Sequence, residues 1–197
     1  MQAKEAMRMV ADATQGNDAL VFVGLPLEKD HKLYNVAAVL QNGEVLAFTP
    51  KRYIPSYAEF YETRHFMPGN EVPETYLFDG EEVPFGTNIL FEVDALHGLT
   101  VGCEICEDIW APLSPGTLHA LAGATVLVNL SASNETVGKD VYREMLVKSS
   151  SAKLIAGYIY ASAGEGESTQ DLVFGGHNMI AENGTILVQS KRFAPEN

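Results

Sequence analysis

The chain of 197 residues lacks the features that would place it in a membrane, outside the cell or on a nucleic acid. No apolar run approaches the roughly 20 residues that a membrane span needs. The N-terminus, MQAKEAMRMVADATQGN, has no apolar middle region of the kind found in secretory signals. Basic residues are few, 13 against 26 acidic ones, and a net charge of −13 repels phosphate backbones. We therefore expect neither a nucleic acid nor a membrane as a partner.

Cysteine is also scarce, and both cysteines stand in CEICEDIW (103–110) together with the single tryptophan. Two cysteines in a chain of this length do not build a disulfide framework, so a reducing cytoplasm is the expected location. A zinc site needs about four ligands at matched spacing. The chain has no second cysteine pair and its five histidines are scattered, so we expect no metal and no cofactor here.

Turn signals and apolar periodicity predict an α/β fold in a single domain spanning residues 1–197. Asn-Gly and Asp-Gly pairs at Asn42, Asp79 and Asn183 each predict a hairpin between flanking apolar runs. The remaining expected strands are 19–25, 88–93, 98–105, 124–133 and 154–163. The first of these is apolar and β-branched, which is typical of a strand buried on both faces.

Helices are expected at 3–14, after Ser114, and at 136–153. Ser114 can cap a helix whose first turn begins with the proline that follows it. Residues 50–70, PKRYIPSYAEFYETRHFMPGN, predict a proline-bounded loop and then a short aromatic helix. Strand hairpins interleaved with strand–helix units indicate a layered structure in which helices cover at least one sheet.

The two cysteines stand in different local settings. Cys103 belongs to the alternating run Leu99, Val101, Cys103, Ile105, whose side chains share one face of a strand. A redox C-x-x-C pair instead opens a helix, so we expect Cys103 to be a small core residue. Cys106 lies where the strand ends, at the edge where α/β proteins place their chemistry. The local sequence leaves open whether it is a nucleophile or packs under the tryptophan.

A cysteine nucleophile needs a group that takes its proton, and no histidine here has a persuasive context. A lysine is ordinarily a surface residue. Lys51, however, opens the rigid aromatic segment 50–70, which is a poor setting for a merely solubilising charge. Glu59 and Glu62 follow within the same segment, so the segment can hold a cation beside carboxylates.

Several motifs taken in order resemble one enzyme family. They are PKRYIPSYAEFYETRHF, EICEDIW, NLSAS and YASAGEGESTQDLVFGGHNMIAENG, in a resemblance that runs from about residue 19 to the C-terminus. Together they resemble the glutaminase domain of glutamine-dependent NAD synthetases, within the nitrilase (carbon–nitrogen hydrolase) superfamily. The resemblance implies a four-layer α-β-β-α sandwich and a Glu-Lys-Cys catalytic triad that releases ammonia from L-glutamine.

Carried over by motif, the resemblance assigns a role to individual residues. Cys106 would be the nucleophile, Lys51 the triad lysine, and Glu59 the second glutamate that the family holds near the lysine. The residues that would bind the substrate are Tyr57, Phe60, Glu107 and Ser133.

One element of the family pattern has no counterpart. The triad glutamate is expected well upstream of the lysine, and Glu5, Glu28 and Glu44 do not stand in that context. We therefore expect a partial glutaminase domain that lacks the first strand and helix of the fold and has negligible glutaminase activity by itself. The synthetase domain, with its ATP and magnesium, would follow residue 197 in the full-length chain.

Two other functions remain open from the sequence. The chain could be part of a stand-alone amidase of the nitrilase superfamily, although ICEDIW favours the synthetase over the shorter motif of such amidases. It could also be a scaffold without catalysis that serves oligomerisation, which intact Lys51 and Cys106 argue against. An uncovered sheet edge invites association, so a homo-oligomer is expected for the glutaminase as well.

Overall fold

The computed structural model describes residues 2–164, 166, 167 and 172–194, which leaves part of the motif YASAGEGESTQ outside the described residues. The chain forms two compact units, Met1–Ile89 and Leu90–Asn197. The assignment of the whole chain to one partial domain stays a prediction. Among the described residues, every helix is too short or too polar to span a bilayer.

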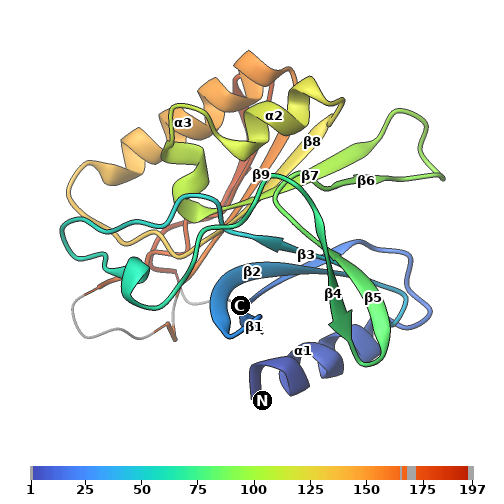
Figure 1. The fold of residues 1–197 in the computed structure, drawn as a ribbon. Coiled ribbons are helices and arrows are strands. Elements are labelled where there is room, and N and C mark those ends of the chain that lie inside the picture. The colour runs from blue at the N-terminus through green and yellow to red at the C-terminus, as the bar shows by residue number, and fades with distance from the viewer. Residues whose placement is uncertain (1, 165, 168–171, 195–197) are drawn as a thin grey trace. The chain divides into compact units, whose positions relative to one another are not determined.

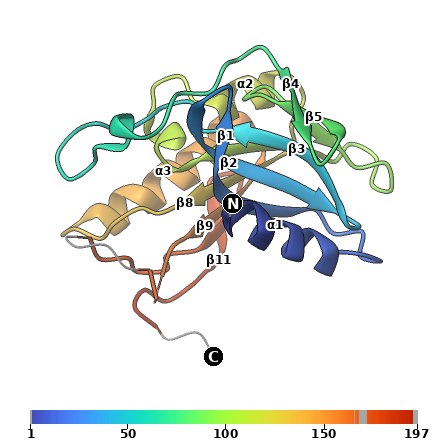
Figure 2. The same cartoon turned by 60° about the horizontal axis from the view of Figure 1, so that its bottom comes forward.

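The first unit is built on a five-stranded sheet in the order β1-β2-β3-β5-β4 (Figure 1). Neighbouring strands pair antiparallel except β3 and β5, which run parallel. The helix α1 (Gln2–Ala13) lies beside this sheet (Figure 2). Its residues Met7 and Ala11 are buried in the core of this unit. The strands are β1 (Val21–Lys29), β2 (Lys32–Gln41), β3 (Glu44–Pro50), β4 (Glu74–Phe78) and β5 (Glu81–Phe85).

Left-handed turn residues set the hairpins of this sheet. Asn42 (φ +50°) turns β2 into β3, and Asp79 (φ +52°) turns β4 into β5, so both predicted hairpins are confirmed. A third hairpin, between β1 and β2, turns at Asp30 (φ +51°). It was not predicted, because Asp-His lacks the glycine that usually marks such a turn.

The expectation that the first strand is buried on both faces is wrong. Within the part of the chain that the structure describes, β1 is an edge strand that pairs with β2 alone, and burial alternates along it. Leu25 and Leu27 are buried, whereas Gly24 and Pro26 are exposed. A proline has no N–H for a sheet ladder and is therefore tolerated at an edge.

Residues 50–70 form the predicted loop, but the expected helix shrinks to one 3₁₀ turn, η1 (Glu62–Arg64). The backbone here bonds to other parts of the unit. The Lys51 N–H donates to the Asn35 carbonyl oxygen at 2.8 Å, and the Gly69 N–H donates to the Lys51 carbonyl oxygen at 2.8 Å. The first bond ties the start of the segment to β2, and the second joins the two ends of the loop.

The second unit contains a six-stranded sheet in the order β11-β10-β9-β8-β7-β6. β7, β8 and β9 run parallel, and β10 and β11 form the hairpin predicted at Asn183. Leu127, Tyr158 and Met179 lie at the centre of its apolar core. The strands are β6 (Leu90–Glu92), β7 (Thr100–Ile105), β8 (Val126–Ser131), β9 (Gly157–Ser162), β10 (Met179–Glu182) and β11 (Thr185–Gln189).

Two helices connect the parallel strands and cover one face of this sheet (Figure 1). α2 (Pro115–Leu121) begins at the predicted cap, where Ser114 Oγ accepts the Thr117 N–H at 3.1 Å. α3 (Lys139–Leu154) follows Gly138, a residue with φ +79°. Because both connections cross from one parallel strand to the next, the carboxyl ends of β7, β8 and β9 lie at the same edge of the sheet.

Candidate active site

Cys106 lies at the carboxyl end of β7, where the sequence predicted it. Its backbone has φ +48°, a left-handed conformation that is uncommon for a residue other than glycine. It opens the 3₁₀ turn η2 (Cys106–Trp110), and Asp108 Oδ2 accepts the Ile105 N–H at 2.9 Å across this turn. The chain therefore leaves the strand sharply at Cys106, whose thiol is half-buried.

Cys103 is the buried core residue that the alternating pattern predicted. It is fully buried within β7 and forms no disulfide. Burial raises the pKa of the Cys103 thiol well above its usual value, and the carboxyl groups of Glu104 and Asp108 raise it further. Because the thiolate is the reactive form, this shift makes Cys103 a poor nucleophile.

A chain of buried polar groups lies behind Cys106. Asn129 Oδ1, on β8, accepts the Cys106 N–H at 3.1 Å and the Ser131 hydroxyl at 2.7 Å. Asn129 Nδ2 donates to the Tyr158 hydroxyl at 3.3 Å, and that hydroxyl donates to Glu104. Burial raises the pKa of Glu104, although its hydrogen bonds act in the opposite direction.

Tyr160 brings two of the predicted site residues into one neighbourhood. Burial raises the pKa of Tyr160 to about 12, and the charge of Cys106 acts in the same direction. The side chains of Ser131 and Ser133 oppose that shift. Cys106 and Ser133 thus lie around the same buried phenol, which the sequence analysis did not single out because tyrosine is an ordinary core residue of strands.

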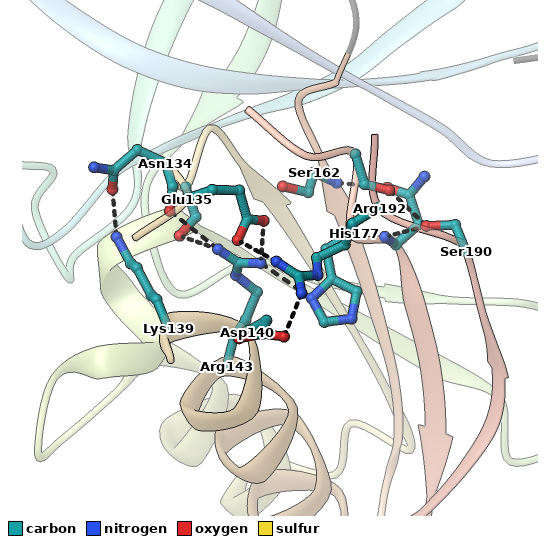
Figure 3. Close-up of polar contacts among 12 residues, drawn as sticks. Asn134, Glu135, Lys139, Asp140, Arg143, Ser162, His177, Ser190 and Arg192 are labelled. Carbon is teal, nitrogen blue, oxygen red and sulfur yellow. Dashed lines mark hydrogen bonds and ion pairs between the residues drawn. The ribbon is translucent and has the colours of Figure 1, made fainter. Parts of the chain in front are cut away.

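Arg143 of α3 reaches the loop after β8 that carries Asn134 and Glu135, as Figure 3 shows. Its guanidinium is almost fully buried. Nη2 donates to Ser133 Oγ at 3.3 Å and to the Asn134 carbonyl oxygen at 3.1 Å, while Nη1 donates to Glu135 Oε1 at 2.7 Å. One side chain therefore fixes three consecutive residues after β8.

A second arginine completes this cluster from the end of the described chain. Arg192 Nη1 contacts Glu135 Oε2 at 3.2 Å, and Arg192 Nη2 contacts Asp140 Oδ2 at 2.6 Å. The Glu135 carboxylate thus lies between two guanidinium groups (Figure 3). The sequence analysis missed the cluster because residues from three separate segments form it, and no local pattern links those segments.

His177 belongs to the same cluster and is held in its neutral form. Its Nδ1 lies 3.0 Å from Arg143 Nη1, and since an arginine can only donate, the imidazole nitrogen accepts. The other ring nitrogen bonds to the side-chain amide of Gln189. Burial lowers the pKa of His177, Arg143 lowers it further, and Glu135 acts in the opposite direction.

This shift predicts a pH-dependent contribution to stability. In the unfolded chain a histidine protonates with a pKa of about 6.5, whereas folded His177 resists protonation. The free energy of unfolding should therefore fall as the pH drops through about 6.5, and should stop falling below the pKa of the folded state. We expect His177→Gln to lack this decrease in urea titrations between about pH 8 and about pH 5. Parallel curves for the variant and the wild type would refute the prediction.

Lys51 immediately follows β3 in the first unit and is not a surface lysine. Its side chain is 1% exposed, and Nζ lies 2.9 Å from both carboxylate oxygens of Glu62. Gly69 lies close against Pro50, the residue before Lys51, since a Cβ added at Gly69 would meet Pro50 Cγ at 2.5 Å. The unit thus holds a buried ammonium beside a carboxylate, as the composition of segment 50–70 indicated.

The other residues assigned to this segment lie on the loop between Lys51 and Glu62. The ring of Tyr57, which is exposed, meets the half-buried ring of Phe60 edge-on with 5.8 Å between centroids. Glu59 is exposed, and the carboxylate bonded to the lysine belongs to Glu62. A catalytic role for Glu59 stays a prediction, as do the substrate contacts of Tyr57, Phe60, Glu107 and Ser133.

Comparison with known proteins identifies the family. Residues 2–196 match the carbon–nitrogen hydrolase family, and the chain belongs to it. The match includes α1, so the family likeness extends further toward the N-terminus than residue 19. The fold is similar to a crystal structure of a glutamine-dependent NAD(+) synthetase from Cytophaga hutchinsonii, with a TM-score of 0.84 and 28% identity over 98% of this chain and 31% of that one. The predicted nitrilase-type α/β fold is thereby confirmed.

Curated relatives agree with this assignment. The chain is 47% identical over 182 residues to the glutamine-dependent NAD(+) synthetase of Mycobacterium tuberculosis H37Rv, which covers 91% of this chain and 27% of that protein. It is 31% identical over 193 residues to the synthetase of Aquifex aeolicus, covering 98% and 30%. An amidase from Nesterenkonia, at 18% identity and a TM-score of 0.72 over 97% and 64%, shares the fold. The chain thus spans less than a third of the length of these curated relatives.

Proposed function

We propose that this chain is the glutamine-hydrolysing part of a glutamine-dependent NAD synthetase. The observation that carries the proposal is the 47% identity to the mycobacterial synthetase over 91% of the chain, in a region where Cys106 occupies a strained turn at the sheet edge. The fold alone would fit any carbon–nitrogen hydrolase. The proposed substrate therefore rests on the relatives, and the proposed nucleophile, the sulfur of Cys106, rests on the strained turn that carries it.

In the proposed reaction, Cys106 Sγ attacks the side-chain carbonyl carbon of L-glutamine. A C–S bond forms and the carbonyl electron pair moves onto oxygen. Collapse of this intermediate breaks the C–N bond, and the nitrogen leaves as ammonia with the proton that came from the thiol. Water then adds to the γ-glutamyl thioester, the C–S bond breaks, and glutamate and the thiol are released. The net change is hydrolysis of one amide bond.

Lys51 supplies the fixed positive charge in this proposal, and with the Glu107 N–H it would stabilise the oxyanion. Glu62 supports the role of the lysine, because its two oxygens fix the direction of the ammonium. The general base of the family is a glutamate upstream of the lysine. Glu5, Glu28 and Glu44 are all exposed. None of the three is therefore a good candidate for this general base.

Ser133 is proposed to hold the substrate, together with Tyr57 and Phe60. The Arg143 guanidinium donates to the Ser133 oxygen and so fixes the position of this hydroxyl group. In the whole protein, ammonia would pass to a synthetase part that uses ATP and magnesium to amidate an NAD precursor. We place that protein in the cytoplasm as a homo-oligomer.

Labelling with a diazoketone analogue of glutamine tests this proposal. We expect one adduct per chain, mapped to Cys106 by peptide mass spectrometry, and we expect L-glutamine but not L-asparagine to slow its formation. Cys106→Ala should abolish the adduct, and Cys103→Ala serves as the matched control that keeps it. Equal protection by other small amides would favour a stand-alone amidase, and absence of any adduct would favour a scaffold without catalysis.

A further inference from the structure

We propose that Asn129 is the positioning residue that holds the nucleophile Cys106 in its left-handed turn, at the head of a buried hydrogen-bond chain that ends at Glu104. The inference rests on the proposed role of Cys106. It adds a residue that acts only through the backbone of the nucleophile and does not touch the substrate.

The turn at Cys106 needs such support. At φ +48° the Cβ of a residue other than glycine is crowded by its own backbone, so this conformation persists only where its surroundings impose it. Asn129 Oδ1 accepts the Cys106 N–H at 3.1 Å. This bond fixes the peptide plane that enters Cys106 and thereby the direction in which the thiol leaves the sheet.

The register of the sheet explains why Asn129 can reach this point. Asn129 pairs with Glu104 on β7 and with Tyr160 on β9, so the three side chains share one face of the sheet. Tyr158 lies two residues before Tyr160 and therefore on that same face. Asn129 is 1% exposed, and all four polar side chains are buried. A buried amide at this position requires partners for its oxygen and for its nitrogen.

Those partners fix the orientation of the amide. Asn129 Nδ2 donates to the Tyr158 hydroxyl, which in turn donates to Glu104 Oε1. Glu104 Oε2 accepts the Gly116 N–H at 2.7 Å, which anchors the far end of the chain on α2. Because the nitrogen of the amide is committed to Tyr158, its oxygen is directed at Cys106. The Ser131 hydroxyl donates to the same oxygen at 2.7 Å and secures that arrangement.

The chain is also tightly fitted at its far end. A Cβ added at Gly116 would meet Glu104 Oε2 at 2.9 Å, so the helix backbone approaches the carboxyl group more closely than a side chain would permit. The Cys106 N–H is already bonded to Asn129. It is therefore not one of the donors in the proposed oxyanion site, which uses the Glu107 N–H.

The test measures the reactivity of the thiol with iodoacetamide, a small electrophile that needs no glutamine pocket. Asn129→Leu, which keeps the approximate shape and removes both polar atoms, is expected to slow alkylation of Cys106 about tenfold. Asn129→Asp keeps an oxygen that can accept the Cys106 N–H, and it should restore part of the rate. The adduct is located by peptide mass spectrometry, with fully buried Cys103 as an internal reference.

Thr125→Val is the matched control. Thr125 Oγ1 accepts the Thr100 N–H at 3.1 Å and so links the β7 and β8 segments at the opposite end of these strands. Its loss should lower stability without changing the alkylation rate. If Asn129→Leu lowers the melting temperature yet leaves the rate at the wild-type value, Asn129 is merely structural and the inference is wrong. If Asn129→Leu does not fold, Asn129→Ser, which is too short to reach Cys106, takes its place with the same expectation.

The two proposals fail separately in this design. A rate that depends on Asn129, in a protein that the glutamine analogue does not label, would retain the positioning role and reject the glutaminase. If the analogue labels the protein but the alkylation rate does not change when Asn129 is replaced, the glutaminase proposal is retained and the positioning role is rejected.

Discussion

Replacing Arg143 by methionine is expected to lower the free energy of unfolding by about 3 kcal/mol or more, because it leaves a buried carboxylate with one partner removed. Glu135 is 6% exposed, and among the described residues Arg192 would be its remaining ion-pair partner. The Ser133 hydroxyl and the Asn134 carbonyl would also lose their donor. Urea unfolding at neutral pH measures the loss.

Two further variants separate the buried charge from the helix that carries it. Lys148→Met removes a surface ion pair on the same helix, where Lys148 Nζ lies 3.8 Å from Glu144, and should cost no more than about 0.5 kcal/mol. Adding Glu135→Gln to Arg143→Met should recover part of the stability, since the unpaired charge is then gone. Similar losses for Arg143→Met and Lys148→Met would contradict the reading of Arg143 as a buried clamp.

Replacing Lys51 by methionine is expected to slow labelling of Cys106 by the glutamine analogue about 10²-fold, the usual size of one lost oxyanion contact. Its effect on stability should be smaller than that of Glu62→Gln. The reason is an asymmetry of burial, because the Lys51 side chain is 1% exposed and that of Glu62 is 26% exposed. Removing the lysine leaves a carboxylate that water can reach. Removing the carboxylate leaves a buried ammonium, which should cost about 3 kcal/mol.

Labelling kinetics and urea unfolding of the wild type, Lys51→Met and Glu62→Gln check both parts of this prediction. Lys32→Met, which removes an exposed lysine of the first unit, is the control and should change neither quantity appreciably. If Lys51→Met is labelled at the wild-type rate, Lys51 is not a member of the proposed triad. A Lys51→Met protein less stable than Glu62→Gln would show that burial does not decide the strength of this pair.

Local patterns were sufficient for much of the fold. Asn42 and Asp79 marked real hairpins because their left-handed conformations are a property of the turn residues themselves. The alternation that ends at Ile105 located both cysteines correctly, since side chains along a strand alternate between its faces. The same reasoning failed for β1, where apolar residues read as a doubly buried strand turned out to form a sheet edge. Whether a strand has one neighbour or two is decided by the rest of the sheet, although Pro26 is a residue that edge strands tolerate.

The candidate site shows the same division more sharply. From the sequence by itself came the nucleophile candidate Cys106, the unusual Lys51 and the family, because each depends on residues that are close together in the chain. Only the tertiary structure assigned Glu62 to the lysine, Asn129 to the cysteine and Arg143 to the loop after β8. These partners are separated by 11, 23 and 9 positions, respectively. The fold of segment 50–70 brings the first pair together, sheet register the second and helix packing the third. A buried charge or amide must have a hydrogen-bond partner, and the tertiary structure decides which residue lies close enough to be that partner.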